Sequence, residues 1–177
     1  CIHNSAKFCA VVKADAYGHG AVAVARKAVE LGADYLAVAV LSEAVELRQA
    51  GFTTPILILG ATSLEDAGIL VENHITQAVF TIEQAKAISV AAMERNTTAK
   101  IHMAVDTGMS RIGVRPEMAG EFAKGVSSMP GIELEGMFSH FALADVKDKT
   151  FSHKQLENFK LAISKVENAG VDIAIKH

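Results

Sequence analysis

The chain has 177 residues, of which half are apolar and about a fifth are charged, and this composition predicts one globular domain with a substantial core. Its 17 Lys and Arg residues are outnumbered by 20 Asp and Glu residues, and without a basic run or an aromatic and basic stripe no nucleic-acid partner is expected. The apolar stretches are interrupted well before the roughly 18 residues that span a bilayer, and no signal-peptide layout is present, so we expect a cytoplasmic protein without membrane contact.

Seven short strands are predicted, and they alternate with longer segments of helical period. Most of the strand segments are nearly continuous apolar runs, as is typical of strands covered on both faces. Because strands and helices alternate, the sheet should be parallel. The predicted strands are residues 8–13, 35–40, 55–59, 77–80, 100–106, 134–140 and 172–176.

Helix boundaries are indicated by capping residues, prolines and glycines. Two capping boxes predict helix starts, one from Thr81 to Gln84 and one from Ser152 to Gln155. Pro116 suits the first turn of another helix. Helix ends are indicated by three glycines, which are Gly32, Gly51 and Gly170.

Two α/β architectures fit this order of elements, an open doubly wound sheet and a closed (β/α)8 barrel. A doubly wound nucleotide-binding sheet normally has a GxGxxG turn after its first strand, and the segment KADAYGHG at 13–20 is not one. Seven consecutive units without a long crossover favour the barrel. The last predicted strand, in DIAIKH at 172–177, has no helix after it. We therefore expect a truncated barrel with about seven of its eight units.

Polar residues follow several of the predicted strands, where a barrel of this kind places its active site. These residues are Lys13, Asp106, His140, Lys176 and His177. Lys13 is the most notable, because removing an ammonium ion from water after a buried run costs several kcal/mol unless something compensates for it.

Three segments resemble the motifs of alanine racemases. AVVKADAYGHG at 10–20 is similar to the lysine motif of that family, AVDTGMSRIG at 104–113 to its arginine motif, and GMFSHFALAD at 136–145 to its histidine motif. The terminal IKH resembles the start of a fourth family segment. The similarity extends over essentially the whole chain, with the motifs in the family's order.

The resemblance implies a pyridoxal 5'-phosphate-dependent enzyme of fold type III that interconverts L-alanine and D-alanine and supplies D-alanine for peptidoglycan. It implies that Lys13 is catalytic and forms a Schiff base with the cofactor. Tyr17 contacts the cofactor phosphate, Arg111 contacts the cofactor and the substrate carboxylate, and His140 stacks on the pyridine ring. No metal is implied. Gly18 and Gly20, just ahead of the next helix, could leave backbone N–H groups facing an anion.

One position departs from the family pattern. Many members carry a carbamylated lysine seven residues before the arginine, and here that position is Ala104. The resemblance also implies a C-terminal β-domain that is absent from the domain formed by residues 1–177, and a homodimer whose partner supplies a second, tyrosine base. On this basis the 177 residues alone are expected to be inactive.

Two other functions remain open at this point. One is a non-catalytic pyridoxal-phosphate-binding protein on the same barrel, and the other is a racemase that acts on serine. The arginine and histidine motifs fit the racemases better than the binding proteins, and they also weigh against a decarboxylase on this barrel.

The remaining cysteines and histidines are expected to carry no chemistry. Cys1 and Cys9 lack a CxxC or His-rich companion, so we expect plain thiols rather than a disulfide or a zinc site. The histidines without a motif around them are expected to be structural or exposed, and they are His74, His102 and His153.

Overall fold

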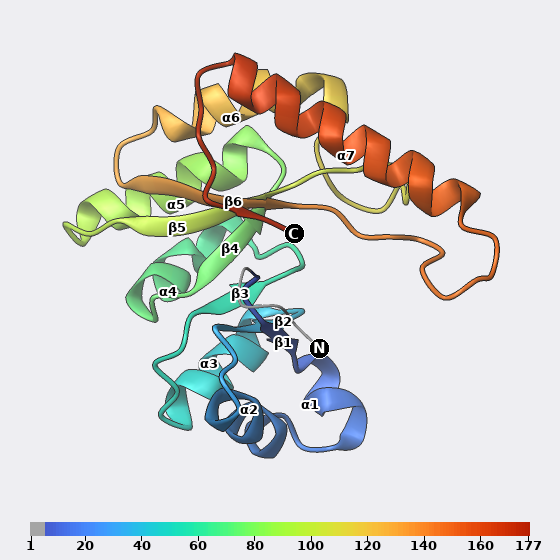
Figure 1. Ribbon diagram of the computed structural model, residues 1–177. Coiled ribbons are helices and arrows are strands. Elements are labelled where there is room, and N and C mark those ends of the chain that lie inside the picture. Colours follow the sequence, from blue (N-terminus) through green and yellow to red (C-terminus); the bar gives the residue numbers. More distant parts are fainter. Residues whose placement is uncertain (1–5) are drawn as a thin grey trace. The chain divides into compact units, whose positions relative to one another are not determined.

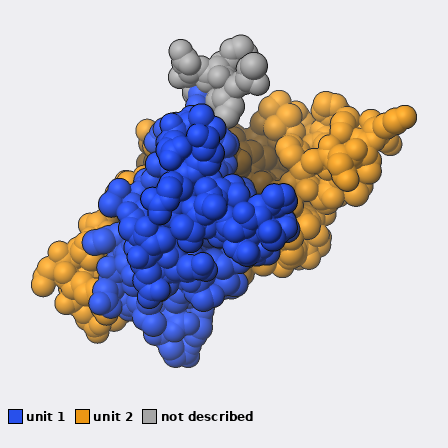
Figure 2. Space-filling view, turned by 90° about the horizontal axis from the view of Figure 1, so that it is seen from below, with its two compact units in different colours: residues 1–78 blue, residues 79–177 orange. Residues whose placement is uncertain are grey.

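The computed structural model describes residues 6–177 (Figure 1). The chain divides into two compact units, Cys1–Ala78 and Val79–His177, which Figure 2 colours separately. In both units short parallel strands alternate with helices.

The first unit is built on neighbouring parallel strands in chain order. Ala10 of the first strand pairs with Leu36, Leu36 pairs with Ile56, and Leu57 pairs with Thr76. These strands are almost wholly buried, which explains their continuous apolar sequence. The elements are β1 (Cys9–Val11), α1 (Lys13–Gly18), α2 (Ala21–Glu30), β2 (Tyr35–Val38), α3 (Leu41–Gln49), β3 (Ile56–Ile58), η1 (Leu64–Asp66), α4 (Ala67–Glu72) and β4 (Thr76–Val79).

Arg48, near the end of α3, ties together the loops of this unit. Its Nε and Nη2 donate to the carbonyl oxygens of Asn73 and His74 at 2.9 Å each, and its Nη1 donates to Phe52 and Thr54 at 3.0 and 2.7 Å. Only the planar fork of arginine supplies this many donors in fixed directions. The Arg48 side chain therefore provides hydrogen-bond donors for the backbone carbonyl groups that follow α3 and α4.

Arg48→Lys should lower the free energy of unfolding by about 2 kcal/mol, because a lysine keeps the charge but cannot reach all four carbonyls. The measurement is urea unfolding of the chain. Arg26→Lys is the control, since within residues 6–177 Arg26 only stacks its guanidinium over the Phe52 ring at 5.4 Å, and it should change stability by about 0.5 kcal/mol or less. Equal effects of the two substitutions would contradict this role for Arg48.

The second unit contains three parallel strands in chain order. Ile101 pairs with Leu134 and Met137 pairs with Lys176, and the register shifts between Ile101 and His102. Helices α6 and α7 pack closely at Gly120. A Cβ at this position would lie 2.4 Å from a backbone oxygen of α7, so only glycine fits there. The elements are α5 (Ile82–Glu94), β5 (Ala99–Ala104), η2 (Pro116–Met118), α6 (Ala119–Ser127), β6 (Ile132–Phe138), α7 (Thr150–Asn168) and β7 (Ile175–Lys176).

All seven predicted strands are present, with boundaries that differ by up to three residues. The polar residues predicted at their ends lie just beyond the hydrogen-bonded strands, with the exception of Lys176 in β7. Most of the strands stop earlier because the chain turns away from the sheet before the apolar run ends, as Val12 after β1 and Val40 after β2 show.

One predicted capping box is confirmed and the other is wrong. Thr81 and Gln84 exchange side-chain and backbone hydrogen bonds at the start of α5. Ser152 lies inside α7 instead of at its start, and the Gln155 side chain bonds to Ala142, Thr107 and His140. The buried amide of Gln155 is used to hold neighbouring loops, so it cannot cap the helix.

The other helix signals agree with the structure. Pro116 begins the single turn of η2, and Gly32, Gly51 and Gly170 follow α2, α3 and α7 with φ of +91°, +87° and +78°. Glycine adopts this left-handed conformation without the steric cost that other residues have.

Residues 6–177 contain no helix that is both long enough and apolar enough to cross a bilayer. Over the same described range, no three His, Cys, Asp or Glu side chains are grouped so that they could hold a metal ion. Cys9 is a free thiol, as predicted, and Cys1 lies outside the described residues.

Candidate active site

Lys13 follows the first strand, separated from it by Val12. The strand and the residue before Lys13 are anchored by the pairing of β1 with β2 and by the Val12 N–H, which donates to the Ala37 oxygen at 2.8 Å. Lys13 is half-buried, and within residues 6–177 no hydrogen bond or ion pair holds its amine. The amine is therefore available for covalent chemistry at the carboxyl end of a strand.

The residues after Lys13 form a turn of left-handed helix. Ala14, Asp15, Ala16 and Tyr17 have φ between 50° and 54° and ψ between 40° and 48°. For residues other than glycine this conformation costs roughly 1 to 2 kcal/mol each, because Cβ crowds the following carbonyl oxygen. Four such residues in a row persist only where their surroundings hold them, and strain of this kind is concentrated at functional sites.

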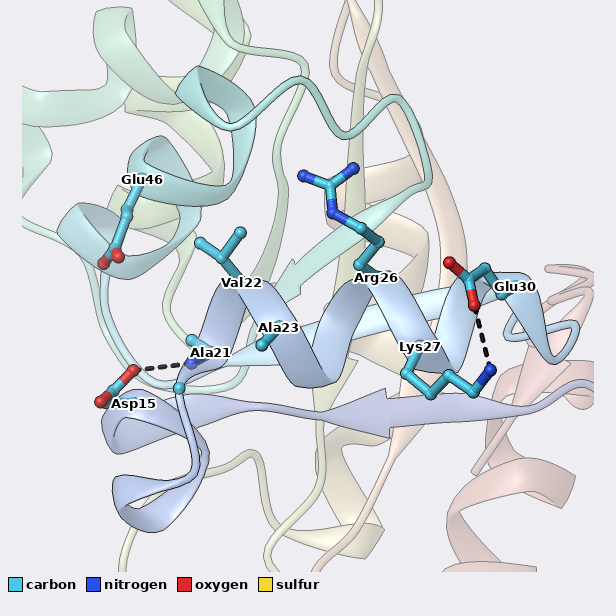
Figure 3. Close-up of a pocket in the computed structure, with 9 residues that line it drawn as sticks. Asp15, Ala21, Val22, Ala23, Arg26, Lys27, Glu30 and Glu46 are labelled. Carbon is cyan, nitrogen blue, oxygen red and sulfur yellow. Dashed lines mark hydrogen bonds and ion pairs between the residues drawn. The ribbon is translucent and has the colours of Figure 1, made fainter.

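Hydrogen bonds to two carboxylates tie this turn to the neighbouring helices. The Ala14 N–H donates to Glu43 Oε1 at 2.6 Å. The Ala21 N–H, at the start of α2, donates to Asp15 Oδ1 at 2.6 Å, as Figure 3 shows, and the Gly20 N–H donates to the Asp15 carbonyl oxygen at 3.0 Å. The strained turn is thus tied to α3 through Glu43 and to α2 through Asp15.

Asp15 changes the role expected for the glycines that precede α2. The backbone N–H groups of Gly20 and Ala21, which could have faced an external anion, already donate to Asp15. The start of α2 is therefore capped from within the chain. Tyr17, at the end of the turn, is 71% exposed, and its hydroxyl has no partner among the described residues.

A pocket of about 630 Å³ lies beside α2 (Figure 3). Its charged lining carries both signs, and Lys27 and Glu30 pair with each other there at 3.1 Å. Neither Lys13 nor Tyr17 lines it. We place no catalytic chemistry in this pocket.

In the second unit, Arg111 lies on a loop that β5 leads into. The ends of the loop are joined by an isolated parallel bridge between Val105 and Val114. Inside it, Asp106 Oδ1 accepts hydrogen bonds from the N–H groups of Gly108 at 3.0 Å and Ser110 at 2.9 Å. Arg111 follows Ser110 in this loop and is exposed, and no residue of 6–177 pairs with its guanidinium.

His140 follows β6, the strand next to β5. Its carbonyl oxygen accepts a hydrogen bond from Gln155 Nε2 at 3.0 Å, and the same nitrogen lies 3.1 Å from Thr107 Oγ1. Thr107 and Ser139 hydrogen-bond to each other at 2.6 Å. Gln155 thus joins the loop that carries Arg111 to the loop that carries His140, at the carboxyl ends of neighbouring strands.

A polar cluster around the buried His102 ring lies in the sheet of this unit. His102 Nδ1 lies 3.0 Å from His177 Nε2, and its Nε2 lies 3.3 Å from Glu135 Oε2. Burial, and to a lesser degree the charge of His102, lowers the pKa of His177 to about 4. The absence of a side chain on Gly136 makes room for the His102 ring, because a Cβ there would lie 2.6 Å from it.

His102 is buried, and the sequence did not indicate its partnership with His177 and Glu135. The available signal was the pair of polar residues, His102 and Glu135, inside the mostly apolar segments of neighbouring strands. In a parallel sheet such residues need partners in the sheet or beside it.

Comparison with known proteins places the chain in a family. The family model described as "Alanine racemase, N-terminal domain" matches residues 1–177. The chain belongs to this family. Alanine racemase of Desulfovibrio desulfuricans is 51% identical over 170 residues, which are 96% of this chain and 46% of that protein. Alanine racemase 2 of Caldanaerobacter subterraneus is 46% identical over 177 residues, again with 46% of its length covered.

Solved structures of alanine racemases have the same fold. The structure from Clostridium difficile matches 99% of this chain with a TM-score of 0.95 at 44% identity, and 46% of that chain is covered. The structure from Bacillus anthracis with bound L-Ala-P matches with a TM-score of 0.91 at 38% identity, also over 99% of this chain and 46% of that one. The predicted fold class is confirmed, with seven parallel strands that match a truncated (β/α) barrel. The chain spans about half the length of the curated relatives it matches.

Within this racemase fold the four predicted site residues fall into two pairs. Lys13 directly precedes the strained turn of the first unit and Tyr17 ends it, whereas Arg111 and His140 follow neighbouring strands in the second. Ala104, at the position of the family's modified lysine, is 2% exposed at the end of β5. The chemical roles of the four residues stay predictions.

Proposed function

We propose that the complete enzyme interconverts L-alanine and D-alanine with pyridoxal 5'-phosphate as cofactor. The complete enzyme is this chain extended to the length of its relatives. The observation that carries the proposal is an unpaired lysine amine on a strained turn after β1, in a chain that belongs to the alanine racemase N-terminal domain family. The relatives' names support alanine rather than serine as substrate.

The chemistry of the available donors fits this cofactor. An aldehyde needs an accessible amine, and no carboxylate among the described residues occupies the amine of Lys13. A phosphate needs hydrogen-bond donors, and the Tyr17 hydroxyl has no partner within residues 6–177. Arg111 offers a guanidinium that no described carboxylate neutralises, which suits a substrate carboxylate.

Each residue then has a definite task. When bound, pyridoxal phosphate supplies an electron-accepting ring that stabilises negative charge on the α-carbon of an amino acid. Lys13 Nζ would hold the cofactor, and as a free amine it would move the α-proton on one face of the substrate. Tyr17 Oη donates a hydrogen bond to the phosphate, Arg111 orients the substrate carboxylate, and the His140 imidazole packs against the ring.

Racemisation also needs a proton donor on the opposite face of the α-carbon. We place it outside residues 1–177, on the partner subunit of a homodimer, as the resemblance implies. Residues 1–177 alone should therefore lack racemase activity. The proposed compartment is the cytoplasm, and the proposed use of D-alanine is in peptidoglycan.

The experiment that tests the function combines product analysis with mapping of the cofactor linkage. The complete enzyme is incubated with the cofactor and L-alanine, and D-alanine is measured by chiral chromatography. A second sample is reduced with borohydride, which makes a C=N linkage permanent, and is digested for peptide mapping. We expect D-alanine and a pyridoxyl group on Lys13. Cofactor binding without D-alanine would favour the non-catalytic binding protein, and faster turnover of serine would change the substrate.

A further inference from the structure

Glu43 makes three hydrogen bonds to backbone N–H groups in two different loops. Its Oε2 accepts from Ala39 at 2.8 Å and from Val40 at 3.3 Å, at the junction between β2 and α3. Its Oε1 accepts from Ala14 at 2.6 Å. Ala14 is the residue directly after Lys13 and the first of the four left-handed residues.

The first two contacts alone are an ordinary way to begin a helix. Val40 is the N-cap of α3 and Glu43 is the third residue of the helix, where a carboxylate commonly accepts the N-cap N–H. Val40 has no side-chain oxygen to complete a reciprocal box. The contact with Ala14 goes further, because helix capping does not require a bond to a residue 29 positions away in sequence.

The position of this third bond determines what it can control. The left-handed turn is disfavoured for Ala14, and its N–H would otherwise lack the partner that the carboxylate provides. Asp15, the next residue of the turn, bonds to Ala21 and ties the turn to the start of α2. Glu43 is therefore the contact that fixes the turn at the end nearest to Lys13.

We propose that Glu43 is a positioning residue, which fixes the backbone next to Lys13 so that the lysine amine meets the cofactor aldehyde. The inference rests on the proposed function. Glu43 touches neither substrate nor cofactor in this role, and it acts only through Ala14. Because a carboxylate accepts from both loops at once, the side chain links the start of α3 to the turn that carries Lys13.

Glu43→Gln is the variant that tests this role, because it keeps the size of the side chain but leaves only one oxygen. The amide nitrogen of the glutamine must then face a backbone N–H group in one of the two loops, so the hydrogen bond to that loop is lost. The matched control is Glu46→Gln, one turn later on the exposed face of α3, which removes the same charge without touching the Lys13 turn. Both variants are made in the complete enzyme.

Three measurements separate positioning from simple helix stabilisation. They are the cofactor Kd, the kcat and KM for alanine, and hydrogen exchange of the cofactor-free protein over residues 13–20 and 41–49. In Glu43→Gln we expect the cofactor Kd to rise about tenfold, which corresponds to the loss of one charge-assisted hydrogen bond. We expect kcat to fall with KM for alanine changed less than about twofold, and faster exchange over residues 13–20. Glu46→Gln should match the unmodified enzyme.

Other outcomes overturn the proposal. A lower unfolding temperature with unchanged cofactor Kd and kcat would make Glu43 a helix cap only. If Glu43→Gln does not fold, Glu43→Asp decides the question, since it keeps the charge near Val40 but shortens the reach to Ala14; an unchanged cofactor Kd in that variant would defeat the idea. If the unmodified enzyme does not bind the cofactor at Lys13, the proposed function itself fails, which is a different result.

Discussion

Replacing Lys13 by alanine will lower racemisation of alanine in the complete enzyme by about a thousandfold or more, because both the covalent attachment and one proton transfer depend on its amine. The amine is the only group on the strained turn that can form a C=N linkage. Chiral analysis of the product measures the loss, and borohydride mapping shows whether the linkage to residue 13 is gone.

Lys27→Ala is the control for this experiment. Lys27 lies on the exposed face of α2 and pairs with Glu30, so its loss should leave racemisation unchanged. A small primary amine added to Lys13→Ala should restore part of the activity, because it supplies the missing base without the tether. Retention of most of the activity by Lys13→Ala, or a pyridoxyl group found on Lys176 in the unmodified enzyme, would show that the catalytic lysine is misassigned.

The strands were the most predictable part of the fold. Segments such as Ile56–Ile58 and Tyr35–Val38 are buried on both faces, and continuous burial leaves a continuous apolar run in the sequence. Their exact ends were less predictable, because the hydrogen-bonded part of a strand ends where the chain turns and not where its hydrophobicity ends. Lys13 and His140 were expected at the very ends of strands and lie two residues beyond them.

The handedness of the turn after Lys13 could not be predicted from the sequence. Ala14 and Ala16 are good helix formers, and nothing in their side chains indicates a left-handed backbone. The conformation depends on contacts from residues that are distant in sequence, such as Glu43, or that lie beyond the turn, such as Ala21. Periodicity reports which face of an element is buried, and it does not report such contacts.

The site residues were recognisable for a different reason. Lys13 and Arg111 were identified by the motifs around them, whereas Gln155 was assigned to a helix cap because its spacing from Ser152 fits one. In the structure Gln155 is buried and joins the loops that follow β5 and β6. A local pattern cannot tell whether a polar side chain bonds within its own helix or across to another segment.

The loop that carries Arg111 should be as sensitive to substitution as the Lys13 turn, and Gly113 is the position that tests it. Gly113 has φ of +126°, and a Cβ there would lie 2.4 Å from the Asp106 nitrogen and 2.7 Å from the Val105 carbonyl carbon. Both atoms belong to backbone held by the bond from the Asp106 N–H to Val114 at 2.9 Å and by the Val105–Val114 bridge. The clash cannot be relieved by rotating a side chain.

Gly113→Ala should therefore lower the free energy of unfolding by about 3 kcal/mol, from backbone strain together with the loss of the bridge that closes the loop. Gly125→Ala is the matched control, because Gly125 lies in α6 and a Cβ there would meet only the Ile82 side chain at 3.7 Å. Alanine favours helix over glycine, so the control should be unchanged or more stable by up to about 1 kcal/mol. Urea unfolding of the 177-residue chain measures both variants.

Since the bridge also sets the position of Arg111, the complete enzyme with Gly113→Ala should lose racemase activity even at temperatures where it stays folded. Equal stability of the two alanine variants would mean that the loop adapts to a side chain at residue 113, and the closed loop would then not be what positions Arg111.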